Sequence, residues 1–90
     1  MSDPLAALKM RFRVRAAADL DRLTRLWADE PETPELRALI HDLAGAAGIF
    51  GFPDLSAAAL EIDNRHASGF QPDGVQMDRL FKCLREAAED

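Results

Sequence analysis

The segment that decides the fold is HDLAGAAGIFG, residues 41–51, which places a histidine in a helix with little bulk on the histidine's own side. At about 100° per residue, a helix over residues 36–50 gathers its apolar side chains on one face. These side chains are Leu36, Leu39, Leu43, Ala46, Ala47 and Phe50. His41 lies almost opposite them, so we expect the apolar face to pack into a core and the imidazole to project away from it.

The neighbours of His41 on its own face are small. Residues three, four and seven positions apart share one side of a helix, which places Ala38, Ala44, Gly45 and Gly48 beside His41. A glycine inside a helix costs about 1 kcal/mol relative to alanine, so the two glycines need a local reason. Close approach of another molecule is such a reason, and we predict that these four residues form a docking surface. The alternative is a surface histidine with no special role.

Three further segments carry apolar residues at helical spacing. The first, residues 4–28, forms one long helix, or two helices with a break near residues 15–18. The third and fourth helices cover residues 53–67 and the segment after Asp73. Their predicted core residues are Leu5, Leu8, Phe12, Ala16, Leu20, Leu23 and Trp27 in the first helix, Leu55, Ala58, Ala59 and Ile62 in the third, and Val75, Met77, Leu80, Phe81, Leu84 and Ala88 in the fourth.

The intervening segments contain prolines and glycines that end helices, at residues 29–34, 51–54 and 69–74. Asp3, Thr33 and Asp73 stand where helix caps are expected. Four helices with one apolar stripe each, joined by short loops, predict an all-α fold, an antiparallel four-helix bundle that forms a single domain over residues 1–90.

The composition excludes several classes of function. A net charge of −5 argues against a general nucleic-acid-binding protein and against an anionic membrane surface as partner. The single cysteine, Cys83, allows no intrachain disulfide, and no clustered Cys/His pattern predicts a metal site. Without a signal peptide or an apolar run of about 18 to 20 residues, we expect a cytoplasmic protein. The basic cluster Lys9, Arg11, Arg13 and Arg15 is either a solvated face or a docking rim for an acidic partner.

Residues 41–55 resemble the signature of histidine-containing phosphotransfer (HPt) domains. In that signature an apolar residue follows the histidine at the second position, glycine at the fourth, small residues at the fifth and sixth, and glycine at the tenth. Leu43, Gly45, Ala46, Ala47 and Gly51 match these positions in order, and Leu55 follows. The family usually has a lysine near the phosphoryl group at the third position, where this chain has Ala44.

The resemblance implies that His41 is the phosphorylated residue and that Asp63 supports it. Asp63 follows His41 by 22 positions, where the family has a polar side chain that hydrogen-bonds the imidazole. A carboxylate there would accept from Nδ1–H and leave the Nε2 lone pair free, although a solvated aspartate is the alternative. Arg37, one turn before His41, could supply the missing positive charge. A metal site of His41, Asp63 and His66 has no spacing signature in its favour, and a buried or surface histidine at the end of the helix accounts better for His66.

The function implied by the resemblance is that of a phosphorelay intermediate rather than a stand-alone catalyst. The chain would accept phosphate from an aspartyl-phosphate on a response-regulator receiver domain or a hybrid histidine kinase, and return it to another receiver. We expect no cofactor on the chain itself, Mg²⁺ on the receiver partner, and a monomer. The alternative is a helical protein that docks to receivers or kinases without transferring phosphate, which Ala44 favours. An enzyme with His41 as general base lacks a serine, cysteine or paired carboxylate at catalytic spacing.

Overall fold

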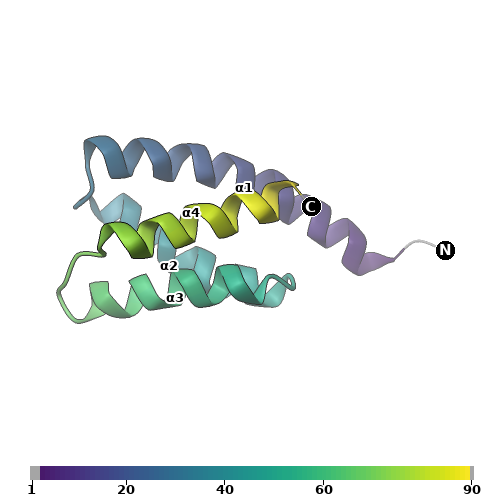
Figure 1. Ribbon diagram of the computed structural model, residues 1–90. Coiled ribbons are helices and arrows are strands. Elements are labelled where there is room, and N and C mark those ends of the chain that lie inside the picture. Colours follow the sequence, from purple (N-terminus) through teal and green to yellow (C-terminus); the bar gives the residue numbers. More distant parts are fainter. Residues whose placement is uncertain (1–2, 90) are drawn as a thin grey trace.

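The computed structural model describes residues 3–89, which form four helices. They are α1 (Pro4–Asp29), α2 (Pro34–Ile49), α3 (Pro53–Ala67) and α4 (Gly74–Glu89). Consecutive helices run in opposite directions and pack as a bundle, beyond which the N-terminal end of α1 projects (Figure 1). The predicted all-α four-helix bundle is confirmed. Residues 15–18 are helical, so the alternative of a break in the first helix is wrong.

Local sequence signals set the helix ends. The side chains of Asp3 and Thr33 accept hydrogen bonds from the backbone two residues further on, at the starts of α1 and α2. At α4 the caps are reciprocal: the backbone N–H of Gln76 donates to Asp73 Oδ1 at 2.8 Å, and the Asp73 N–H donates to Gln76 Oε1 at 3.1 Å. The three predicted caps are therefore confirmed.

Gly51 ends α2 in the left-handed conformation, with φ of +85°. Its N–H donates to the Gly48 carbonyl, and the Phe52 N–H donates to the Ala47 carbonyl, which is the Schellman arrangement. The turn brings Phe50 and Phe52 against Phe12 of α1, with ring centroids 5.4 and 5.0 Å apart. This aromatic cluster closes the bundle at the end where α2 passes into α3.

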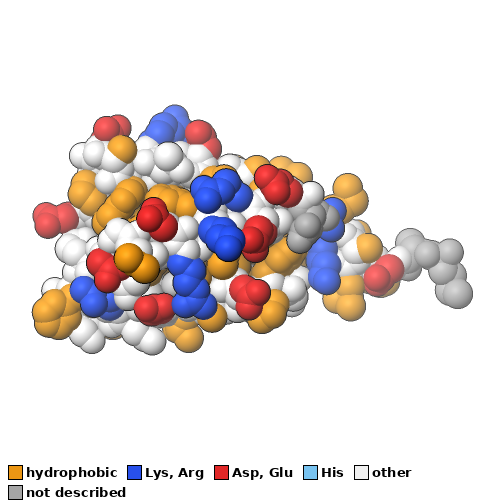
Figure 2. Space-filling view, in the orientation of Figure 1, with side chains coloured by type: hydrophobic (Ala, Val, Ile, Leu, Met, Phe, Trp, Pro, Cys, Tyr) orange, Lys and Arg blue, Asp and Glu red, His pale blue; other side chains and the backbone are white. Residues whose placement is uncertain are grey.

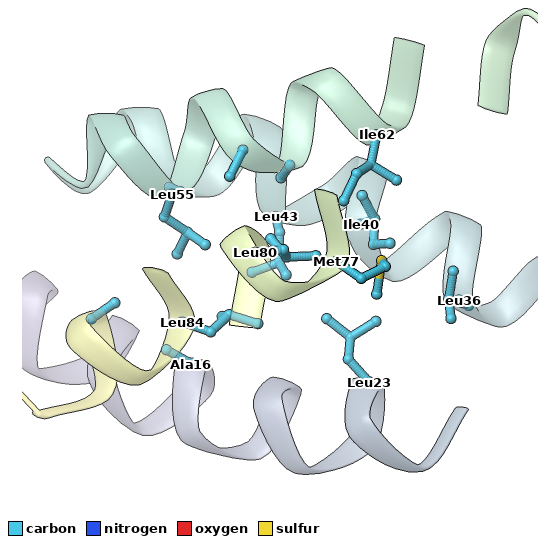
Figure 3. Close-up of a cluster of buried hydrophobic side chains, with 14 of the residues drawn as sticks. Ala16, Leu23, Leu36, Ile40, Leu43, Leu55, Ile62, Met77, Leu80 and Leu84 are labelled. Atoms are coloured by element: carbon cyan, nitrogen blue, oxygen red, sulfur yellow. The ribbon is translucent and has the colours of Figure 1, made fainter. Parts of the chain in front are cut away.

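The core is filled by apolar side chains from all four helices (Figure 3). Each fully buried leucine or isoleucine contributes about 1.5–3 kcal/mol relative to an exposed position. The largest of these side chains are Phe12, Leu23, Leu36, Ile40, Leu43, Leu55, Ile62, Met77, Leu80 and Leu84. No helix within residues 3–89 combines the length and the apolar character that crossing a bilayer requires.

Several predicted core positions differ in the structure. Leu5 is 63% exposed and Leu8 is also exposed, because the first turns of α1 extend past the ends of the other helices. Val75 is 79% exposed, since a spacing of two residues places it on the opposite side of α4 from Met77. Ile40, which the sequence analysis did not assign to the core, is fully buried.

Candidate functional site

His41 and Asp63 meet on the surface where α2 packs against α3. His41 Nδ1 lies 3.0 Å from Asp63 Oδ2, a hydrogen-bonding distance. The His41 side chain is 71% exposed and that of Asp63 is 25% exposed. The structure thus brings together the two residues expected to act as a pair, with the imidazole open to solvent and the carboxylate held closer to the protein.

The carboxylate sets the protonation of the imidazole. The hydrogen bond from His41 to Asp63 raises the pKa of His41 above its ordinary value, and the negative charges of Asp63 and Asp42 act in the same direction. In the neutral ring, donation from Nδ1–H leaves Nε2 as the nitrogen with a free lone pair. His41 therefore offers Nε2 as a nucleophile and has a neighbouring carboxylate that stabilises positive charge on the ring.

Two shallow hollows flank His41. The first lies between α2 and α3 and is lined by Arg37, Ala38, Asp63, His66 and Ala67. The second lies between α1 and α2 and is lined by Arg15, Gly45, Ala46, Ile49 and Phe50. Of the four residues expected to form a docking surface, Ala38 and Gly45 line these hollows, whereas Ala44 and Gly48 line neither.

Ala44 and Gly48 lie where α2 approaches α3. The Ser56 hydroxyl donates to the Ala44 carbonyl at 2.7 Å, and a Cβ added to Gly48 would lie 3.2 Å from Ser56 Oγ. A Cβ added to Gly45, in contrast, would have no atom within 4 Å. Packing between helices therefore explains the small residue at 48 without an external partner, while Gly45 has no intramolecular reason for lacking a side chain.

Two guanidinium groups lie on either side of His41. Arg37 Nη2 donates to the backbone carbonyl of His66 at 3.1 Å, near the C-terminal end of α3 where helix carbonyls lack intrahelical partners. Arg15, from α1, is held by Asp19, with Nε 3.2 Å from Oδ2. The sequence analysis placed Arg15 in a basic cluster but did not connect it with His41, because no local spacing relates α1 to α2.

His66 has the opposite environment to His41. It is only 5% exposed, and neither ring nitrogen has a hydrogen-bond partner among residues 3–89. Burial lowers the pKa of His66, and the positive charge of Arg37 lowers it further. The ring is therefore neutral at pH 7 and poorly accessible to a partner. The part of the chain that the structure describes contains no group of three or more His, Cys, Asp or Glu side chains that could hold a metal ion.

The sequence of the chain matches a known protein family. A family model described as "Hpt domain" matches residues 7–90 of the chain. Searches among curated proteins and among solved structures gave no significant match. The match covers α1 from residue 7 onward and all of α2, α3 and α4, and so includes His41, Asp63 and both hollows.

Proposed function

The chain belongs to the Hpt domain family, and from this premise we propose that its 90 residues form one domain that carries a phosphoryl group on His41 in a two-component phosphorelay. Hpt domains interact with receiver domains and histidine kinases, so phosphorelay signalling is the setting of this chain. The proposed donor is an aspartyl-phosphate on a receiver or hybrid kinase, and the proposed acceptor is the aspartate of another receiver. Because of these partners, we propose that the protein is located in the cytoplasm.

The observation that carries this proposal is the exposed imidazole with its Nδ1 directed to Asp63. In the proposed step, the Nε2 lone pair attacks phosphorus, the N–P bond forms, and the bond from phosphorus to the aspartyl oxygen breaks. The receiver's carboxylate leaves with the electron pair. The proton on Nδ1 stays in its hydrogen bond to Asp63, whose negative charge stabilises the positive ring.

The surroundings of His41 suit transfer between two proteins. Phosphoryl transfer depends mainly on positioning and on charge stabilisation. The partner supplies Mg²⁺ and its acidic pocket, while Ala38 and Gly45 leave room for it to approach. Arg37 and Arg15 each line one of the hollows beside His41, and we propose that they attract the phosphoryl oxygens where the family usually has a lysine.

The second candidate is a docking protein that binds receivers or kinases without transferring phosphate. Ala44 is the observation that favours it, because this position lacks the family's lysine and is partly buried against α3. Such a protein would retain the docking surface and the affinity for receivers. It would accumulate no phosphohistidine.

The test is incubation with a set of receiver domains labelled on their aspartates with radioactive phosphate. We expect acid-labile label on the wild type and on His66→Gln, and none on His41→Gln. Circular dichroism of both variants controls for folding. Label that persists in His41→Gln would overturn the assignment of the site. Wild-type binding to a receiver by calorimetry, with no label from any receiver, would establish the docking function instead.

A further inference from the structure

The projecting end of α1 carries apolar side chains that nothing in the described structure covers. Leu5, Met10 and Val14 are highly exposed, and Leu8 is exposed to a lesser degree. The turns that carry Leu5 and Leu8 lie beyond the ends of the other helices (Figure 1). Leu5 and Leu8 lie on one side of α1 and Met10 and Val14 on the other, and exposed apolar side chains that neighbour each other, such as Leu5 and Leu8, indicate an interaction surface.

The same end of α1 is strongly basic. Residues 4–15 contain four basic and no acidic side chains, in a chain whose net charge is −5. Lys9, Arg11 and Arg13 form no ion pair with any carboxylate of residues 3–89. Figure 2 shows basic and hydrophobic side chains side by side on this projection. The surface that would complement it is apolar in its centre and acidic at its rim.

A hollow of that description lies at the same end of the molecule. It has a volume of about 140 Å³ and lies between the turn after α2 and the C-terminal half of α4. Its apolar lining includes Phe52, Pro53, Leu55 and Ala87, and its carboxylates are Asp54 and Glu86. A cavity of about 150 Å³ admits benzene, so this hollow has room for one apolar side chain.

The two carboxylates affect a thiol that lines this hollow. Burial raises the pKa of the Cys83 thiol, which also lines it, and the negative charges of Glu86 and Asp54 raise it further. Lys9 reaches the edge of the hollow from α1, because a Cβ added to Gly51 would lie 3.1 Å from Lys9 Cε. The basic apolar projection and the acidic apolar hollow are therefore adjacent parts of one surface.

We propose that two copies of this chain pair about a two-fold axis, with Leu5 of each copy seated in the hollow of the other and Lys9 facing Glu86. A two-fold interface requires a self-complementary surface, which a projection and a matching hollow at one end of the molecule provide. A receiver or an anionic membrane would use the basic projection and leave the acidic hollow empty. This inference replaces the expectation of a monomer. The hollow shares no lining residue with the two hollows beside His41, so this proposal and the proposed phosphotransfer rest on different residues.

The first test is sedimentation velocity of the full chain from micromolar to millimolar concentration. We expect a concentration-dependent dimer, and a dissociation constant raised about tenfold or more by Leu5→Glu, because that variant places a charge where an apolar side chain is buried. Val75→Glu is the matched control, since Val75 is also highly exposed but lies at the start of α4, and it should leave the dimer intact. A wild type that stays monomeric at every concentration would overturn the proposal, as would a dimer that Leu5→Glu leaves unchanged.

Charge exchange gives the more specific test. Lys9→Glu and Glu86→Lys should each weaken self-association, because each homodimer would oppose like charges at both contacts. An equimolar mixture of the two variants should restore the dimer, since opposite charges then meet at both contacts. Failure of the mixture to associate would contradict the assigned contact. Both positions are exposed, and unchanged circular dichroism would establish that the variants fold.

The single cysteine provides a local measurement. Cys83 lines the hollow, so its rate of reaction with an aromatic disulfide reagent should fall as the wild-type concentration rises and should stay constant in Leu5→Glu. A rate that is independent of concentration in a wild type that dimerises would place the interface elsewhere and refute the model. Binding of a monomeric wild type to vesicles with anionic lipids would instead assign the projection to membranes.

Discussion

Gly45 is the position at which stability and docking should oppose each other most clearly. It lies inside α2, and a Cβ added there would have no atom within 4 Å. Alanine should therefore recover the full helix propensity of about 1 kcal/mol. For a domain of 60–100 residues, this corresponds to a rise in Tm of about 4–8 °C. Gly48→Ala is the matched control and should gain less, because its Cβ would lie 3.2 Å from Ser56 Oγ.

Bulk at the same position should impair transfer. Gly45→Gln places an uncharged side chain in the hollow beside His41 while glutamine retains good helix propensity. A displacement of about 1 Å at the reacting atoms costs roughly 10²-fold in rate, so we expect transfer from a phosphorylated receiver to fall by about one to two orders of magnitude. Rapid-quench measurement of label on this chain gives the rate. The control is Gly74→Gln, at the open start of α4, which should transfer normally.

Two results would refute this reasoning. If Gly45→Ala did not raise Tm, a side chain at position 45 would not have the open space that the structure shows there. If Gly45→Gln transferred phosphate at the wild-type rate and bound the receiver with unchanged affinity, the surface around Gly45 would not be the docking surface. The glycine would then have no explanation in either packing or function.

Three further predictions address the core, the buried histidine and the charges beside the site. Leu43→Ala should lower the free energy of unfolding by about 2–5 kcal/mol, measured in urea, because Leu43 is fully buried. The pKa of His66 is lower in the folded than in the unfolded chain, so the free energy of unfolding should fall as the pH drops through the unfolded value of about 6.5. His66→Leu should remove this loss of stability. If the pH dependence of His66→Leu matched that of the wild type, the burial argument would be contradicted. Arg37→Ala should lower the steady-state level of phosphorylated protein and Ala44→Lys should raise it, at fixed ionic strength with one receiver. If neither changes the level, the electrostatic role of this surface is mistaken.

The helices could be predicted from the sequence because their signals are local. Prolines at the first helical positions and the caps Asp3, Thr33 and Asp73 fix the starts of helices within a few residues. Gly51 and Gly69 end helices where the chain must adopt positive φ. These features act through bonds between neighbours in the sequence, so they require no knowledge of the packing.

The relations between helices could not be predicted in the same way. The spacing of Leu5 and Leu8 is that of a core stripe, but their burial depends on how far the other helices extend. Arg15 lies beside His41 only because α1 and α2 pack together, and no sequence motif indicates this packing. The pairing of His41 with Asp63 was expected from a family resemblance, whereas its distance of 3.0 Å is a property of the packed bundle.

The packing between α2 and α3 sets the geometry of the imidazole that we propose as the nucleophile. His41 is on one helix and Asp63 on the other, so the distance between them depends on how closely the two helices approach. Gly48 leaves space for Ser56, whose hydroxyl donates to the Ala44 carbonyl of α2, about one turn away from His41. A Cβ at Gly48 would lie 3.2 Å from Ser56 Oγ, so the Ser56 side chain would have to shift. The docking role that the sequence analysis assigned to Gly48 stays a prediction, and the contact with Ser56 gives this glycine a second reason to be small, in the packing of the two helices that carry His41 and Asp63.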